Sequence, residues 1–347
     1  MTETMMKAVR MRFVAVWYVV LWLLGGTFAC GREVELTIWP AKAGATARKL
    51  HFVPAAENLI DADAVPLYRL AVQAAPSDVP SEKIDQWRKM QPGQMPLDRV
   101  REVLDGFGTA FTYLDQAAAC RKCWWPAFVP GRLPANLSEY RTLAKGLCLR
   151  AHLELAQGQY EKAAATIGTG LTMAEHLGRA ENLTQNLVGI AIAALMYGEI
   201  EQFIQQKGSP SLYQALEDLK TPLIDVAKTL DAEIATIRRQ YNLLTARAMI
   251  GQLAPAHNKV RLIGNRLLRQ RKLLQCIEAI RLHAGENGRL PGNLGAIAQV
   301  SVPTDPLDDE PFEYEGGARH GVLKAAVPKG GDPKDGFEYK LRVGRED

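Results

Sequence analysis

Apolar residues recur every three or four positions along most of the chain, which is the spacing of one buried face on an α-helix. Two such stripes flank Gly158, one over residues 143–155 and the next over residues 160–177. Glycine ends helices because it adopts backbone angles that other residues avoid. The pattern therefore predicts a helix-turn-helix hairpin whose two apolar faces are buried against each other and against neighbouring helices.

Further stripes at helical spacing lie before and after this hairpin. They cover residues 64–75, 100–119, 183–204, 212–219 and 223–248. A regular solenoid needs at least three matching repeats, and only one hairpin unit can be traced here. We therefore expect a mainly α fold with an irregular helical-hairpin, tetratricopeptide-like array over residues 56–258. Residues 31–55 read as a linker with a short strand at most.

The pattern changes in the last zone, residues 259–347. A helical stripe ends at Asn287-Gly288, and three candidate strands follow at 311–315, 322–327 and 337–343. The last strand alternates apolar and charged residues without a break, which is typical of a half-buried strand. Because a small sheet needs cover for its apolar face, we predict an α+β module of one helix and about three antiparallel strands.

The N-terminus has the pattern of an export signal. Lys7, Arg10 and Arg12 precede the apolar run 13–24, and small residues lead to Cys30. Three outcomes remain open for residues 1–30: cleavage after Ala29, lipidation of Cys30, or retention as a membrane anchor. In each case the protein is expected to be exported, either periplasmic or membrane-associated. The apolar run 187–197 is shorter and predicts a buried helix.

Export changes how the cysteines are interpreted, because disulfides persist in oxidising compartments. Cys120 and Cys123 are disulfide candidates, with buried free thiols as the alternative. A structural zinc site needs four ligands, and no second cysteine pair has matching spacing. A thioredoxin-like redox motif needs a strand-to-helix setting, whereas this pair follows a helical stripe. We therefore expect a structural role for the pair.

With 47% apolar residues in 347 and a formal charge of +4, the composition indicates a globular protein without a strong charge. The helical region after about residue 237 is strongly basic and contains few acidic residues. Arg266, Arg269 and Lys272 share a helical face opposite Leu267 and Leu274, which predicts a solvated face. The alternative is contact with anionic lipid or cell-wall polymer. Aromatic residues do not interleave these cations, so nucleic acid is not an expected partner.

Signatures of catalysis are absent from the sequence. The six histidines are scattered without a His-Glu-x-x-His motif, although His152 and His176 could face each other across the hairpin. The acidic residues at 305–310, with Asp332 and Asp335, fit ordinary turns better than a calcium loop. We predict no metal and no cofactor.

Trp124 and Trp125 lie beside a proline and have two interpretations. Flat aromatic rings can form a platform for carbohydrate or peptide, or they can pack between the two helical zones. Core packing is the preferred interpretation.

Several stretches together resemble an uncharacterised family of exported bacterial proteins, of the kind found in planctomycete-type genomes. They are residues 157–163 (QGQYEKA), 120–125 (CRKCWW), 211–216 (SLYQAL) and 221–225 (TPLID), with Asp305-Pro306 leading into 311–314 (PFEY). The last part is also similar to the C-terminal module of type II secretion pseudopilins. Pilins carry a glutamate near the start of their apolar N-terminal helix, and residues 13–24 contain none, which argues against filament assembly.

The sequence favours an exported, envelope-associated binding or scaffolding protein without catalytic activity. Its expected partner is another envelope protein. Two alternatives remain: an envelope hydrolase with a dispersed site, and an accessory protein of a secretion machinery.

Overall fold

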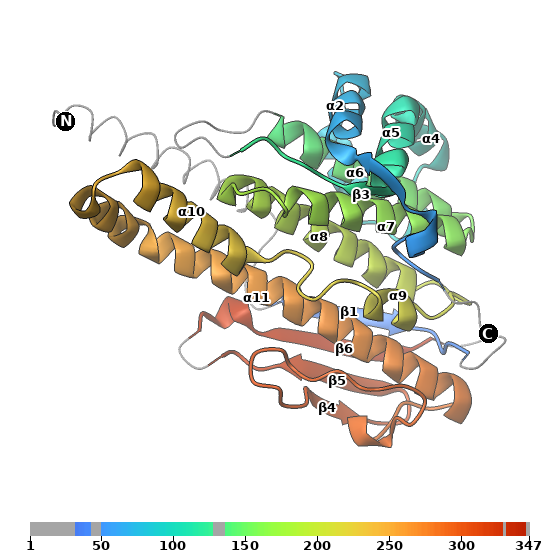
Figure 1. The fold of residues 1–347 in the computed structure, drawn as a ribbon. Helices are drawn as coiled ribbons and strands as arrows, with labels where there is room; N and C mark the ends of the chain where they lie inside the picture. Colours follow the sequence, from blue (N-terminus) through green and yellow to red (C-terminus); the bar gives the residue numbers. More distant parts are fainter. Residues whose placement is uncertain (1–31, 43–49, 128–135, 329–330, 345–347) are drawn as a thin grey trace.

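The computed structural model describes residues 32–42, 50–127, 136–328 and 331–344. The predicted export segment, with Ala29 and Cys30, lies outside these residues. The fold is mainly α-helical with a small sheet, as the sequence predicts, but this sheet is mixed rather than antiparallel, and a separate two-stranded pair accompanies it. Figure 1 shows the helices stacked above the sheet, with the long helix α11 running between them.

The predicted hairpin forms the centre of the helical array. Helices α6 (Leu137–Ala156) and α7 (Tyr160–Leu177) are joined at Gly158, whose φ of 67° lies in the left-handed region. Helix α8 (Leu183–Ile204) packs along both. Among the described helices, α8 alone is long and apolar enough to cross a membrane, but 78% of its apolar window is buried inside the protein. It is thus a core helix of this array.

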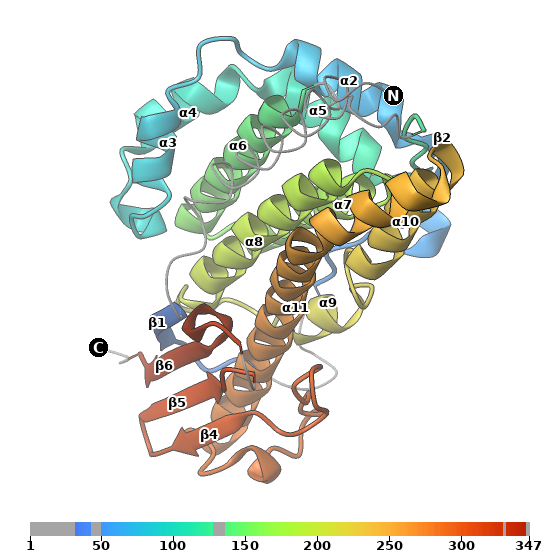
Figure 2. The same cartoon turned by 90° about the vertical axis from the view of Figure 1, so that its left-hand side faces the viewer.

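Shorter N-terminal helices cover one side of the hairpin. They are α2 (Ala64–Ala74), α3 (Ser81–Trp87), α4 (Leu97–Asp105) and α5 (Gly108–Ala118), with single 3₁₀ turns at Ala56–Asn58 and Pro92–Gln94. Figure 2 shows α3 and α4 at the outer edge of this layer. A parallel two-strand pair, β2 (Ile60–Asp63) and β3 (Cys120–Lys122), ties the start of the layer to its end.

The remaining helices are α9 (Tyr213–Glu217), α10 (Val226–Gln240) and α11 (Leu243–Asn287). The single stripe predicted over 223–248 is broken between α10 and α11, where Asn242 caps the new helix by accepting a hydrogen bond from Thr245 N. Helix α11 is 45 residues long and ends at Gly288, with φ 67°. It passes without interruption through position 258, so the helical array and the C-terminal module share one helix.

The sheet has four strands rather than the predicted three. Its order is β1-β6-β5-β4, where β1 is Arg32–Ile38, β4 Glu313–Gly316, β5 His320–Ala325 and β6 Phe337–Val343. Single 3₁₀ turns at Leu294–Ala296 and Pro333–Asp335 lie in the connections. Strand β1 pairs in parallel with β6, so part of the predicted linker belongs to the sheet. Leu36 and Ile38 of β1 are buried beside the apolar face of β6. This burial explains why the segment pairs with the sheet and does not form an exposed linker.

Candidate functional site

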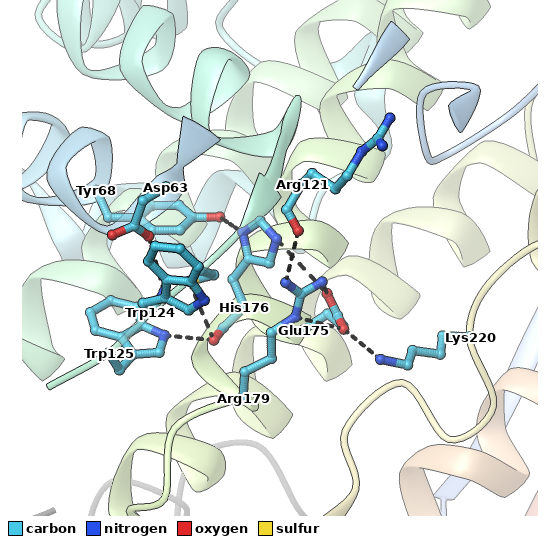
Figure 3. A network of polar contacts seen from close by, with 10 residues as sticks. Asp63, Tyr68, Arg121, Trp124, Trp125, Glu175, His176, Arg179 and Lys220 are labelled. Carbon is cyan, nitrogen blue, oxygen red and sulfur yellow. Dashed lines mark hydrogen bonds and ion pairs between the residues drawn. The ribbon is translucent and has the colours of Figure 1, made fainter. Parts of the chain in front are cut away.

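The best-defined polar site lies against the C-terminal half of α7. Thr172, Glu175, His176 and Arg179 recur at steps of three and four and therefore share one helical face. This face lines a cavity of about 160 Å³ that is open to solvent and bordered by β3 and by the segment around Lys220 between α9 and α10. Figure 3 shows the side chains converging from these elements.

His176 is held by two aromatic residues. The Tyr68 hydroxyl lies 2.8 Å from Nδ1, and the Trp125 indole N–H donates to the His176 carbonyl at 2.6 Å. Burial, followed by the charge of Arg179, lowers the pKa of His176 to about 4, so the ring is neutral at pH 7. We assign the proton to Nε2, which lies 3.9 Å from the Glu175 carboxylate, so that Tyr68 donates to Nδ1.

Glu175 is the anionic centre of the site. Arg179 binds it through Nε at 3.1 Å and Nη2 at 2.8 Å, and Lys220 Nζ lies 3.1 Å from the same carboxylate. Burial by itself raises the pKa of Glu175, but Arg179 and the other neighbouring groups outweigh burial and lower it. The carboxylate is therefore ionised and already occupied by cations.

An aromatic cluster supports the histidine from behind. Tyr68 stacks on Trp125 with ring centroids 6.1 Å apart and meets Tyr140 edge-on at 6.3 Å. Burial raises the pKa of Tyr68 well above its usual value, so its hydroxyl remains a donor. Trp125 thus has the predicted packing role. Trp124 does not, because it is 68% exposed, with Lys122 Nζ 5.4 Å above its ring.

Cys120 and Cys123 lie next to this cluster as buried free thiols, and no disulfide joins them. The Cys123 thiol faces the His176 carbonyl at 3.8 Å, and Cys120 Sγ donates to the Gln116 carbonyl at 3.4 Å. Burial raises the pKa of Cys123 to about 12 and also raises that of Cys120. Of the two interpretations of the pair, the structure has the buried thiols, in a protonated and unreactive form.

The basic face predicted on α11 is not a solvated surface. Arg269 is only 3% exposed and pairs with Asp305, and Arg266 pairs with Asp335. Lys272 is half-buried and donates to Gln275 at 3.3 Å. The predicted solvated face is therefore wrong for Arg266 and Arg269, because the sheet and its connecting segments cover this side of α11. The alternative of an anionic-lipid or polymer contact stays a prediction. The acidic turn residues neutralise the arginines.

Other predicted candidates are likewise used inside the fold. His152 is fully buried and bonds to Glu199 instead of facing His176. Among the described residues, no group of three or more histidine, cysteine, aspartate or glutamate side chains is placed to hold a metal ion.

A second, larger hollow lies at the outer edge of the helical layer, between the α2–α3 connection, α3 and α4. Its volume is about 640 Å³, within the range typical of ligand sites. We call it the α3–α4 groove. Apolar side chains that are partly or fully buried form its floor, and exposed charged side chains form its rim. The floor includes Val79, Trp87, Val103 and Phe107, and the rim includes Asp78, Lys83, Arg99 and Glu102.

Comparisons of the chain with protein-family models, with curated proteins and with solved structures give no match in any of the three.

Proposed function

We propose that the protein is an exported, envelope-associated binding protein that holds a segment of another envelope protein in the α3–α4 groove, without catalysing a reaction. The export part rests on the basic, apolar and small-residue pattern of residues 1–30. The binding part rests on the groove itself.

The shape and chemistry of the groove support an extended polypeptide as its occupant. An apolar floor with a polar rim is the usual arrangement of protein-binding surfaces. Trp87 supplies a rigid aromatic side chain of the kind that dominates such contacts. The rim carries both signs of charge, with Arg99 and Glu102 already paired at 3.2 Å and Lys83 and Asp78 on the opposite wall. A peptide offers apolar side chains and charges of both signs, and it matches this lining.

The polar site on α7 supports binding over hydrolysis. A general base works best with a pKa near the working pH, and His176, with a pKa of about 4, is a weak base. The neighbouring Cys123 is held as the thiol rather than the nucleophilic thiolate. Glu175 is bound by two cations and does not activate a nucleophile.

Site-specific photocrosslinking in the native envelope tests the proposal. We would place p-benzoylphenylalanine at Gln86, an exposed residue that lines the groove, and separately at Glu310, an exposed residue before β4. We expect one discrete crosslinked protein from position 86 and none from position 310. Equal crosslinking at both positions, or none at position 86, would contradict the proposal.

A charge placed on the groove floor gives an independent test. Val103→Glu puts a carboxylate among the apolar residues of the groove floor, and we expect it to abolish the crosslink from position 86. The matched control is Val327→Glu, on a residue that is already 44% exposed next to the sheet. Circular dichroism and thermal unfolding of both variants establish that they are folded. A crosslink that survives Val103→Glu would remove the groove from the interaction.

A further inference from the structure

The side chains that line the cavity against α7 carry more positive than negative charge. Arg121, Arg179 and Lys220 line it, and Glu175 is the one lining carboxylate. Three cations and one carboxylate, with His176 neutral, leave an excess of two positive charges. Arg121 donates one N–H to the Ala56 carbonyl at 2.8 Å, and its charge helps to lower the pKa of Asp61 after Lys122, but it forms no direct ion pair with a carboxylate among the described residues. The cavity is thus electrostatically prepared for an anion.

A buried hydroxyl in the same wall lacks a hydrogen-bond partner. Thr172 is 9% exposed, and its Oγ1 bonds neither to the preceding turn of α7 nor to another described residue. Nearly all buried polar groups in folded proteins are paired, and an unpaired one has a free-energy cost. Thr166 and Thr169 on the same helix each donate to a carboxylate, to Glu154 and Asp115. The exception at Thr172 occurs where the side chain lines the cavity.

The remaining walls are mostly apolar and set the size of a ligand. Leu171, Leu219 and Leu223 line the cavity together with Val53 and Leu59. Its volume of about 160 Å³ is close to that of the dry cavity of roughly 150 Å³ that accommodates benzene in an engineered protein. A ligand of this size has an apolar body of about six carbon atoms and one small charged group.

We propose that this cavity binds a small apolar carboxylate, about the size of benzoate. Its carboxylate accepts from the Thr172 hydroxyl, which water does not reach in the empty protein, after the Thr172 side chain rotates toward the cavity. Arg121 and Lys220 neutralise the carboxylate, and the apolar body of the ligand packs against Leu171 and Leu223. The Nε2–H of neutral His176 is a further donor on the same wall. None of these residues lines the α3–α4 groove, so this inference stands or falls separately from the proposed function.

Titration calorimetry of the purified full-length protein with three probes tests the site. The probes are benzoate, its neutral analogue benzamide, and inorganic phosphate. We expect benzoate to bind at least tenfold more tightly than benzamide, since a charged acceptor strengthens each hydrogen bond. Raising the salt concentration should weaken the binding of benzoate, because ions screen its charge, and should leave the binding of benzamide unchanged. Equal binding of benzoate and benzamide, phosphate binding in place of benzoate, or no benzoate binding at millimolar concentration would overturn the assignment.

Thr172→Val separates a binding role from a structural one. Valine has nearly the same shape and removes only a hydroxyl that is unpartnered in the empty protein, so the thermal stability should be unchanged or raised. Benzoate affinity should fall about tenfold, the usual effect of one hydrogen bond to a charged group. Thr142→Val in α6, outside the cavity, is the matched control and should keep the affinity. Unchanged benzoate affinity in Thr172→Val would refute the proposal.

Lys220→Gln provides a second variant whose folding is not at issue. The Lys220 side chain is 68% exposed, and its removal leaves Glu175 paired with Arg179. We expect benzoate affinity to fall several-fold with no loss of secondary structure. Wild-type affinity in this variant would show that the charge at the cavity mouth has no part in binding.

Discussion

Substitution of Arg269 by methionine removes the central cation between α11 and the segments around the sheet. The Arg269 Nε lies 3.0 and 2.9 Å from the two carboxylate oxygens of Asp305. Its Nη1 and Nη2 donate to the carbonyls of Asp335 and Ala326, each at 2.7 Å. Methionine fills much of the same space but donates none of these hydrogen bonds. The variant therefore leaves Asp305, which is 5% exposed, as a buried carboxylate without its cation.

The expected loss follows from this burial. Removal of one partner from a buried ion pair costs about 3–5 kcal/mol, because the remaining charge has neither water nor a counterion. The solvated face that the sequence suggests for Arg269 predicts a change within about 0.5 kcal/mol instead. Arg261→Met, at an exposed position of the same helix, is the matched control and should stay within that smaller range.

Equilibrium denaturation followed by circular dichroism gives the free energy of unfolding of each variant. The double variant Arg269→Met with Asp305→Leu should recover most of the loss, since an ion pair replaced by apolar groups of similar volume is often neutral. A loss below about 1 kcal/mol for Arg269→Met, or no recovery in the double variant, would refute the inference that this pair holds the sheet to α11.

Three further outcomes are expected. Gly168→Ala in α7 should destabilise the protein by at least about 2 kcal/mol, because the new Cβ would lie 1.9 Å from the Phe52 carbonyl oxygen; Gly198→Ala in α8 has open space and should be neutral or stabilising in thermal unfolding. Because the folded-state pKa of His176 is about 4 against 6.5 unfolded, neutral His176 contributes full stability above pH 6.5. This contribution, roughly 3 kcal/mol, is lost as the pH falls from 6.5 to 4, so unfolding curves of wild type should depend more steeply on pH there than those of His176→Gln. Cys123, with a thiol pKa of about 12, should react with a thiol reagent at pH 8 only after unfolding, and fast reaction in the native protein would contradict its burial.

Elements with a strong local pattern were predictable from the sequence. The bounds expected for residues 183–204 and 337–343 are those of α8 and β6. Their signals are a helical period and a strict alternation, both of which depend only on residues near in the chain. The pairing of β1 was not predictable in this way, because its partner β6 lies at the other end of the sequence.

Whether the basic side chains of α11 face solvent or the protein interior could not be predicted from the local sequence either. A cation on a helix gives the same pattern whether it faces water or a buried carboxylate, and Asp305 lies 36 positions beyond Arg269. The acidic turn that was noted as a separate cluster is the partner of the basic face.

Only part of the candidate site on α7 could be predicted from the sequence. The spacing of Thr172, Glu175, His176 and Arg179 places them on one helical face, and this could have been read from the sequence. The contact of His176 with Tyr68 joins residues 108 positions apart, and no local pattern reports it. The missing partner of Thr172 is a property of packing alone.

The parallel pairing of β1 with β6 has a consequence for synthesis of the chain. The Arg342 to Thr37 contact joins residues 305 positions apart, and β6 is the inner strand between β1 and β5. During translation β1 is made long before β6, and its pairing edge has no partner until residues 337–343 have left the ribosome. A chain that ends before Phe337 would therefore leave both β1 and β5 with an open edge, the type of surface from which strands of separate molecules join.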